Sequence, residues 1–136
     1  MHNLRAAVAG TGFMGSTHVE ALRCLGVGVA GVLGDTPDKG RAASERLGIG
    51  RAYDSLDELL TDQAVDVVHI CTPNYLHHPL ARAALETGKH VLCEKPLTVN
   101  TAQPAELVQM VILSQVRPSC TAPERSAGSR CQLPEE

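Results

Sequence analysis

Short apolar segments alternate along the chain with segments whose apolar residues recur every three or four positions. The apolar segments at residues 4–9, 27–33, 65–71 and 90–93 predict buried strands, and residues 52–53 predict a very short one. A helical pattern follows each of them: directly after the first glycine cluster, over 38–47, after Ser55, over 79–87, and from about 101 to 113. This alternation predicts an α/β fold, doubly wound around a mostly parallel sheet with helices on both faces.

The pattern ends near residue 113. Residues 114–136 contain scattered prolines, serines and arginines with neither a strand nor a helix period. We therefore expect one domain over residues 1–113 and an irregular or disordered tail over residues 114–136.

Composition narrows the classes of partner. The net charge is −3, no basic block occurs, and aromatic residues make up 2% of the chain. These values argue against a nucleic acid or a membrane surface as the main partner and leave a small-molecule ligand, with the oligomeric state open. The five cysteines form no C-x-x-C pair, and the apolar start is used as a strand rather than a signal peptide. We expect reduced thiols and a cytoplasmic protein.

The first strand runs into a turn with the spacing G-x-G-x-x-G, made by Gly10, Gly12 and Gly15. Between a strand and a helix, this spacing is typical of a Rossmann-like dinucleotide-binding unit. Gly10 allows the sharp turn, Gly12 lets a pyrophosphate approach the backbone, and Gly15 lets the helix pack close to the strand. Phe13 and Met14 lie at the helix start, where free N–H groups hold phosphates. We predict NAD or NADP as the cofactor.

Asp35 ends the second strand, 20 residues after Gly15. An acidic residue at this place accepts hydrogen bonds from a ribose 2′-hydroxyl and favours NAD. The alternative is that Asp35 belongs to a turn and helix cap. Lys39 and Arg41 are the nearest residues that could receive the 2′-phosphate of NADP.

The strand over residues 65–71 is broken at its carboxyl end by Thr72, Pro73 and Asn74. Ligands of open parallel sheets bind at that end, so we predict that these residues contact the cofactor. Asn74 would then lie on the nicotinamide side, or else it caps a turn.

A metal site is not expected. His77 and His78 are adjacent and point apart on a helix, and the cysteines fit no ligand spacing. Cys71 and Cys93 are predicted to be small buried residues, and His69 a packed and hydrogen-bonded core residue.

Three motifs carry a resemblance to a known family: the glycine turn with His18 just inside its helix, Thr72-Pro73-Asn74 with His77, and Cys93-Glu94-Lys95-Pro96-Leu97 after the fifth strand. Over residues 3–113 the chain resembles the Gfo/Idh/MocA oxidoreductases. The resemblance implies that Lys95 contacts substrate and assists proton transfer, because an ammonium stabilises a developing alkoxide. Glu94 would orient its neighbours close to the cofactor. Taken without the family, Glu94 and Lys95 predict a surface ion pair.

The implied function is hydride transfer between NAD(P) and a sugar-like or cyclitol-like hydroxyl. The family's second domain, which supplies most substrate contacts, is absent from this sequence, so we expect a fragment that is inactive alone. Whether the chain is an enzyme in its own right is left open by the sequence. The alternative is a non-catalytic nucleotide-binding module or sensor. An S-adenosylmethionine methyltransferase also opens with a glycine-rich turn, but Glu94-Lys95-Pro96 argues against it.

His18 and His77 occupy motif positions of the family. Each would lie near the cofactor or serve as a structural cap.

Overall fold

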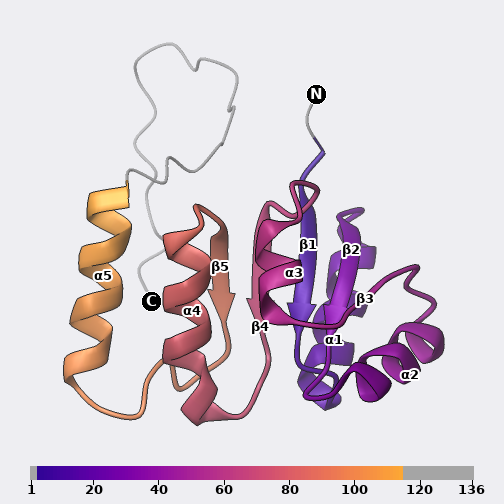
Figure 1. The fold of residues 1–136 in the computed structure, drawn as a ribbon, viewed down its shortest axis with the longest axis horizontal. Coiled ribbons are helices and arrows are strands. Elements are labelled where there is room, and N and C mark those ends of the chain that lie inside the picture. Colours follow the sequence, from indigo (N-terminus) through magenta and orange to yellow (C-terminus); the bar gives the residue numbers. More distant parts are fainter. Residues whose placement is uncertain (1–2, 115–136) are drawn as a thin grey trace, which may run out of the picture.

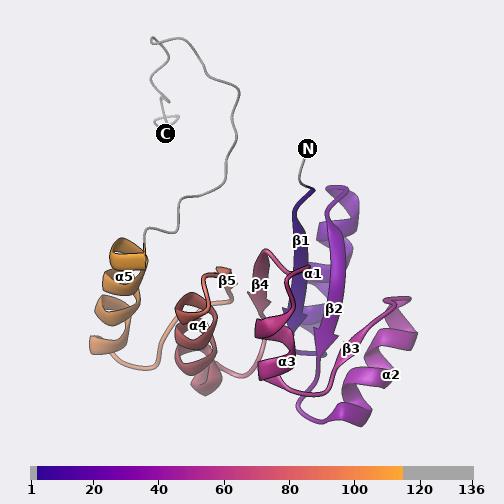
Figure 2. The same cartoon turned by 45° about the horizontal axis from the view of Figure 1, so that its top comes forward.

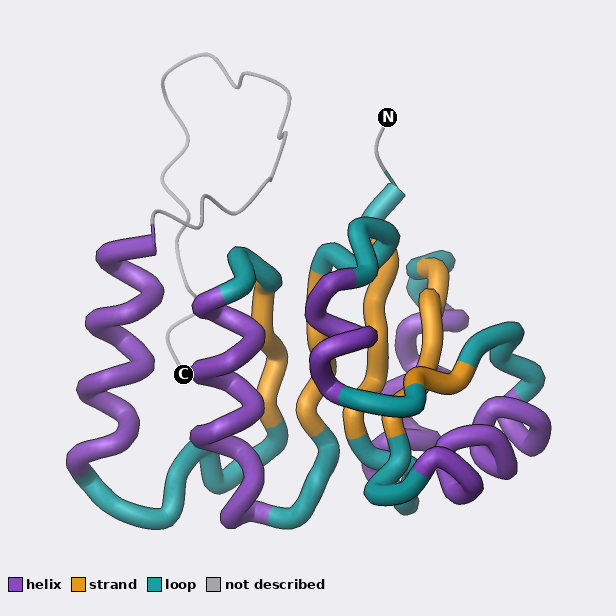
Figure 3. The backbone as a smooth tube through the Cα atoms, in the orientation of Figure 1, coloured by secondary structure: helices purple, strands orange, loops and turns teal. Residues whose placement is uncertain are grey.

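The computed structural model describes residues 3–114, which form a single parallel sheet flanked by helices (Figures 1 and 3). The strands are β1 (Arg5–Ala9), β2 (Gly28–Leu33), β3 (Ala52–Tyr53), β4 (Val67–Ile70) and β5 (His90–Cys93). The helices are α1 (Phe13–Cys24), α2 (Pro37–Leu47), α3 (Leu56–Thr61), α4 (His77–Glu86) and α5 (Ala102–Ser114), with a 3-10 turn η1 (Asn74–Leu76) before α4. The predicted doubly wound α/β fold is confirmed.

The strand order is β3-β2-β1-β4-β5, and every neighbouring pair is parallel. The chain therefore first adds β2 and β3 on one side of β1 and then adds β4 and β5 on its other side. All five carboxyl ends lie at one edge of the sheet, and the reversal falls between β1 and β4 (Figure 1). Ligands of such sheets bind in the crevice at this reversal.

Two apolar cores cover the two faces of the sheet. One contains residues of α1 and α2, and the other contains residues of α3, α4 and α5. β1 runs between them, and its last four residues are fully buried. A strand covered on both faces needs an uninterrupted apolar run, which explains why residues 6–9 show no alternation.

Helix α5 lies beside α4 at the end of the molecule (Figure 2). Glu106 of α5 bonds to His78 at 2.9 Å and forms an ion pair with Arg82 at 3.1 Å. Of the described helices, none is long and apolar enough to cross a bilayer.

Several predicted boundaries shift by one or two residues. The helix predicted from residue 79 starts at His77, because Pro79 fits in a first turn where its missing N–H costs no hydrogen bond. The strand predicted over 65–71 covers only Val67–Ile70, since the N–H of Val65 instead closes a turn onto Asp62. The tail predicted over 114–136 lies outside the described residues except for Ser114, which ends α5.

The capping box predicted before α3 forms, but Glu58 accepts from a different backbone N–H than expected. Ser55 accepts a hydrogen bond from the N–H of Glu58, as expected. The carboxylate of Glu58 accepts from the N–H of Asp54, one residue before the cap, and also pairs with Arg51. Both interactions hold the pKa of Glu58 below its usual value, with the backbone bond the larger cause.

Candidate cofactor-binding site

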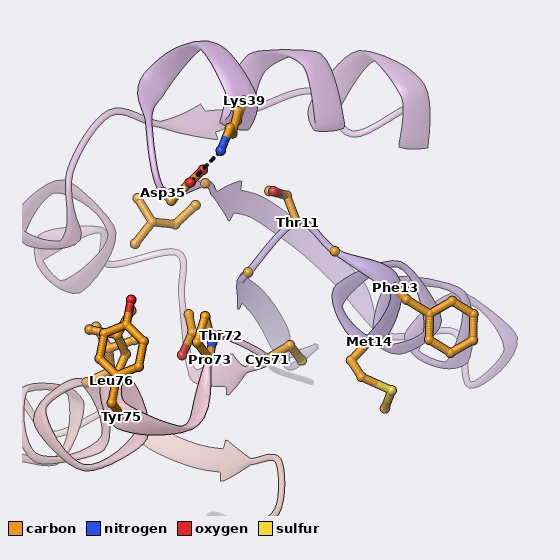
Figure 4. Close-up of a pocket in the computed structure, with 15 residues that line it drawn as sticks. Thr11, Phe13, Met14, Asp35, Lys39, Cys71, Thr72, Pro73, Tyr75 and Leu76 are labelled. Carbon is orange, nitrogen blue, oxygen red and sulfur yellow. Dashed lines mark hydrogen bonds and ion pairs between the residues drawn. The ribbon is translucent and has the colours of Figure 1, made fainter.

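A cleft of about 670 Å³ lies at the carboxyl ends of β1, β2 and β4, at the reversal of strand order (Figure 4). Its walls come from the glycine turn, from the loop after β2, and from the segment between β4 and α4. The lining residues are Gly10, Thr11, Gly12, Phe13, Met14, Leu33, Gly34, Asp35, Lys39, Cys71, Thr72, Pro73, Tyr75, Leu76 and Leu80.

The glycine turn is held by contacts that only glycine permits at two of its three positions. Gly10 has a φ of 111°, and a Cβ there would lie 2.5 Å from the carbonyl oxygen of Cys71. A Cβ on Gly15 would lie 2.0 Å from the carbonyl oxygen of Gly10. Gly15 is therefore buried beneath the turn and does not line the cleft, which agrees with its predicted packing role and not with direct cofactor contact.

Gly12 differs from the other two glycines. Its φ is −79°, a value open to any residue, and a Cβ there would meet nothing within 4 Å. Gly12 is also the N-cap of α1, which has no side-chain cap and no acidic residue in its first turn. The N–H groups at this helix start, at Phe13 and Met14, therefore face open space beside the cleft with the positive end of the helix dipole.

The side chains of Asp35 and Lys39 lie next to each other, across the cleft from Tyr75 and Leu76 (Figure 4). The ammonium of Lys39 bonds to the carboxylate of Asp35 at 2.6 Å, and this hydrogen bond holds the pKa of Asp35 below its usual value. Arg41, the other basic residue considered for NADP, instead pairs with Asp38 and Asp54 and does not line the cleft.

Thr72 follows β4 and lines the floor of the cleft with Pro73. The hydroxyl of Thr72 is buried, and it is the one buried side-chain polar atom without a hydrogen-bond partner in the described part of the chain. Buried polar atoms are normally hydrogen-bonded, so this unpaired hydroxyl is unusual in a residue that lines the cleft.

Asn74, His77, Glu94 and Lys95 do not line the cleft. Asn74 is exposed at the start of η1, where its backbone carbonyl accepts from the N–H of His77 and its side chain forms no cap hydrogen bond, so the turn-cap alternative is not observed either. The His77 side chain is only 1% exposed, and its ring bonds to the carbonyl oxygens of Thr72 and Pro96.

Glu94 forms a partly buried hydrogen-bonded chain with two histidines, and no side-chain ion pair joins it to Lys95 within the described residues. His18 Nε2 lies 2.7 Å from the Glu94 carboxylate, and His18 Nδ1 lies 3.0 Å from Nδ1 of His69. The bond from His18 holds the pKa of Glu94 below its usual value, and burial lowers the pKa of His69. The surface ion pair predicted from residue order is thus wrong, while His69 is the hydrogen-bonded core residue that was predicted.

Lys95 is exposed on the segment that follows β5. Because β5 is parallel to β1, this segment lies at the same edge of the sheet as the glycine turn (Figure 1). The bond between Glu94 and His18 ties the segment to α1, the helix that begins at that turn. Lys95 therefore lies at the same edge of the sheet as the cleft and does not form part of its wall.

Comparison with known proteins agrees with this geometry. Residues 4–120 match a family model described as an oxidoreductase family with an NAD-binding Rossmann fold, GFO_IDH_MocA. The chain belongs to the Gfo/Idh/MocA oxidoreductase family. The resemblance drawn from the motifs is confirmed, and with it the NAD-binding class of the fold.

The relatives that the chain matches are longer proteins. The chain is 39% identical over 110 residues to the uncharacterized oxidoreductase ORF334 of Rhizobium meliloti, covering 79% of this chain and 33% of that protein. It is 34% identical over 107 residues to myo-inositol 2-dehydrogenase of Thermotoga maritima, covering 78% and 32%. The solved structure of a levoglucosan dehydrogenase with NADH and levoglucosan matches with a TM-score of 0.75 and 30% identity, covering 80% and 32%. The chain thus spans about a third of the length of these relatives.

Sequence reasoning missed the apolar wall of this Gfo/Idh/MocA cleft. Tyr75, Leu76 and Leu80 come from η1 and α4, and Leu33 ends β2. Leu33 could have been found, since it is the last residue of a strand in a fold whose ligands bind at strand ends. The side chains of η1 could not, because their direction depends on a turn that the sequence pattern did not predict.

Cys71, which lines the cleft, and Cys93, which ends β5, are poor nucleophiles. Burial, aided by the charge of Glu94, raises the pKa of Cys71 to about 12 and that of Cys93 to about 11. Only the thiolate attacks, so these thiols are unreactive near neutral pH. Both residues are half-buried, so the prediction that they are buried residues is met only in part.

Proposed function

We propose that the cleft binds a nicotinamide dinucleotide with its pyrophosphate against Gly12 and the N-terminus of α1. The observation that carries this proposal is the open space at Gly12. Nothing in the described chain requires glycine there, neither its φ nor a neighbouring atom. A phosphate that approaches the backbone would require it.

The unpartnered hydroxyl of Thr72 supports the same placement, because a rotation of this side chain toward the cleft would let a cofactor group form its hydrogen bond. Asp35 would accept from the adenosine ribose, with Lys39 beside it to meet a 2′-phosphate where NADP binds. The apolar side chains of Leu33, Tyr75 and Leu76 would cover the adenine.

We further propose that the complete protein transfers a hydride between NAD(P) and a hydroxyl of a sugar or cyclitol. The relatives named for myo-inositol and levoglucosan support this substrate class. The bound nicotinamide supplies or accepts the hydride, and Lys95 would stabilise negative charge on the reacting oxygen and move its proton. Residues 1–113 would be the dinucleotide-binding domain, with substrate contacts made elsewhere in the protein.

A cytoplasmic location and a small-molecule rather than nucleic-acid partner belong to the same proposal. They are supported by the net charge of −3 and by the free thiols at Cys24, Cys71 and Cys93.

Titration of the purified 136-residue chain with NADH and NADPH tests the binding proposal. We expect saturable but weak binding and no turnover of myo-inositol or levoglucosan.

Thr72→Val should weaken NADH binding about tenfold through loss of one hydrogen bond, with no loss of stability because an unpaired polar atom is removed. Thr61→Val is the matched control, since the Thr61 hydroxyl bonds within α3 and lies outside the cleft. Absence of saturable binding to either nucleotide would refute the proposal.

A further inference from the structure

A guanidinium from α2 holds the glycine turn from outside the cleft. Arg46 lies in the last turn of α2, 35 positions from Thr11 in the chain, and does not line the cleft. Its Nη2 donates to the carbonyl oxygen of Thr11 at 3.2 Å, and its Nη1 donates to the hydroxyl of Ser16 at 3.2 Å. The Ser16 hydroxyl donates in turn to the carbonyl oxygen of Gly12 at 3.1 Å. One side chain therefore fixes two consecutive carbonyl groups, that of Thr11 directly and that of Gly12 through Ser16.

Chemistry determines which groups donate and which accept in this network. A guanidinium stays charged over the physiological pH range and only donates hydrogen bonds. A hydroxyl has one hydrogen, which Ser16 gives to Gly12, so its oxygen is left to accept from Arg46. The arrangement thus requires no particular tautomer and no shifted pKa.

Fixing these two carbonyl groups also directs two N–H groups. In a trans peptide the N–H points opposite to the carbonyl of the preceding residue, and the peptide bonds of this turn are trans. The carbonyl of Thr11 thus sets the direction of the Gly12 N–H, and the carbonyl of Gly12 sets that of the Phe13 N–H. Neither N–H donates a hydrogen bond within residues 3–114, and both residues line the cleft. These two donors are therefore available to a ligand where the pyrophosphate is proposed to lie.

The charge of Arg46 is not neutralised by a carboxylate among the described residues. Four other arginines of that part of the chain do pair with carboxylates, namely Arg23, Arg41, Arg51 and Arg82. The printed bonds of Arg46 go to Thr11 and Ser16 instead, and α1 has no acidic residue in its first turn. An anion at the start of α1 therefore meets both the positive end of the helix dipole and an unpaired cation beside the turn.

We propose that Arg46 is a positioning residue for the pyrophosphate of the bound dinucleotide. It holds two carbonyl groups of the turn so that the N–H groups of Gly12 and Phe13 face the phosphates, and its charge favours the anion. Its contribution to affinity rests on the proposed function, whereas the orientation of the turn does not.

Displacement of NADH by ADP and by adenosine tests this role. The two competitors share the adenine and the ribose and differ in the diphosphate. Arg46→Ala should weaken NADH and ADP about fivefold and leave adenosine within about twofold. Arg41→Ala is the matched control, because it removes the same charge from the same helix and Arg41 lies outside the cleft. Unchanged ADP affinity in Arg46→Ala, equal weakening of adenosine, or the same loss in Arg41→Ala overturns the proposal.

The conservative variant separates this role from a merely structural one. Arg46→Lys keeps the positive charge and a hydrogen-bond donor, so it should regain most of the ADP affinity that Arg46→Ala loses. A folded Arg46→Lys chain that binds ADP as weakly as Arg46→Ala overturns the part assigned to the charge.

The orientation of the turn is tested without any ligand. In ¹H–¹⁵N spectra of the full chain, the amide signals of Gly12 and Phe13 should shift in Arg46→Ala and stay in place in Arg41→Ala. Arg46 is exposed and alanine favours a helix, so the variant should fold, which far-UV circular dichroism checks. Unchanged amide signals in the folded variant overturn the positioning role. If the unmodified chain binds neither NADH nor ADP, the proposed function fails, while these spectra still decide whether Arg46 orients the turn.

Discussion

Replacing Gly12 by alanine separates the ligand-binding role of the glycine turn from its role in folding. On the folding side the structure predicts little change, because the φ of −79° suits alanine and a Cβ meets nothing within 4 Å. Alanine restricts the unfolded chain, which stabilises the folded protein by about 0.4–1 kcal/mol. Alanine is also a poorer N-cap than glycine, which destabilises the folded protein by a similar amount. We expect the free energy of unfolding to change by less than about 1 kcal/mol.

On the ligand side the effect should be large. The new methyl group occupies the space beside the first N–H groups of α1, where a pyrophosphate would lie. Displacing the phosphate costs at least one hydrogen bond to a charged group, about 1.5–3 kcal/mol. The Kd for NADH should therefore rise about 10-fold to 100-fold.

Gly15→Ala is the informative comparison. Its Cβ would lie 2.0 Å from the carbonyl oxygen of Gly10, so backbone must move, and overpacking of this kind costs about 1–3 kcal/mol or more. Far-UV circular dichroism in urea measures stability in this chain without tryptophan, and NADH fluorescence measures binding. A folded Gly12→Ala chain that binds NADH with unchanged affinity would refute the proposed phosphate position. Destabilisation equal to that of Gly15→Ala would refute the separation of roles.

Three further outcomes follow from the site. Lys39→Ala should lower NADPH affinity about tenfold and change NADH affinity less than twofold, since Lys39 meets only a 2′-phosphate. Asp35→Asn should instead weaken NADH binding. Paired titrations with the two nucleotides measure both effects, and equal losses in Lys39→Ala would contradict the assigned role of Lys39. Because burial lowers the pKa of His69 in the folded state, the unfolded chain binds more protons below about pH 6.5, so stability should fall on acidification; urea titrations of His69→Phe should lack this part of the slope. At pH 8, Cys71, with its pKa raised to about 12, should react with iodoacetamide at least about tenfold more slowly than exposed Cys24, as measured by peptide mass spectrometry, and equal rates would show that Cys71 is accessible and acidic.

The strands and the glycine turn were predictable because local periodicity and spacing determine them. The run at residues 6–9 is buried on both faces, so its apolar character is continuous and visible without any tertiary information. Gly10 and Gly15 were assigned correct local roles for a similar reason, since a turn and a close helix approach depend on nearby backbone. What the spacing did not reveal was which motif residues face the cleft.

Sequence order did not predict which side chains pair when they lie far apart in the chain. Glu94 and Lys95 are adjacent and opposite in charge, which predicts an ion pair, yet the carboxylate bonds to His18, 76 positions away in the chain. The reason is topological: β5 delivers Glu94 to the same sheet edge at which α1 begins, so that a helical histidine is closer to the carboxylate than the flexible end of its neighbour.

The Glu94–Lys95–Pro96 segment is consequently held from both faces of the sheet. His18, on the face covered by α1, bonds to the Glu94 carboxylate, and His77, on the face covered by α4, bonds to the Pro96 carbonyl. Lys95 lies between these two bonds with its own side chain exposed. A lysine that must contact a substrate needs a free ammonium on a fixed backbone. The two bonds fix the backbone and leave the Lys95 side chain free to move. The two histidines therefore have equivalent tasks on opposite faces, although only one of them contacts a residue that lines the cleft.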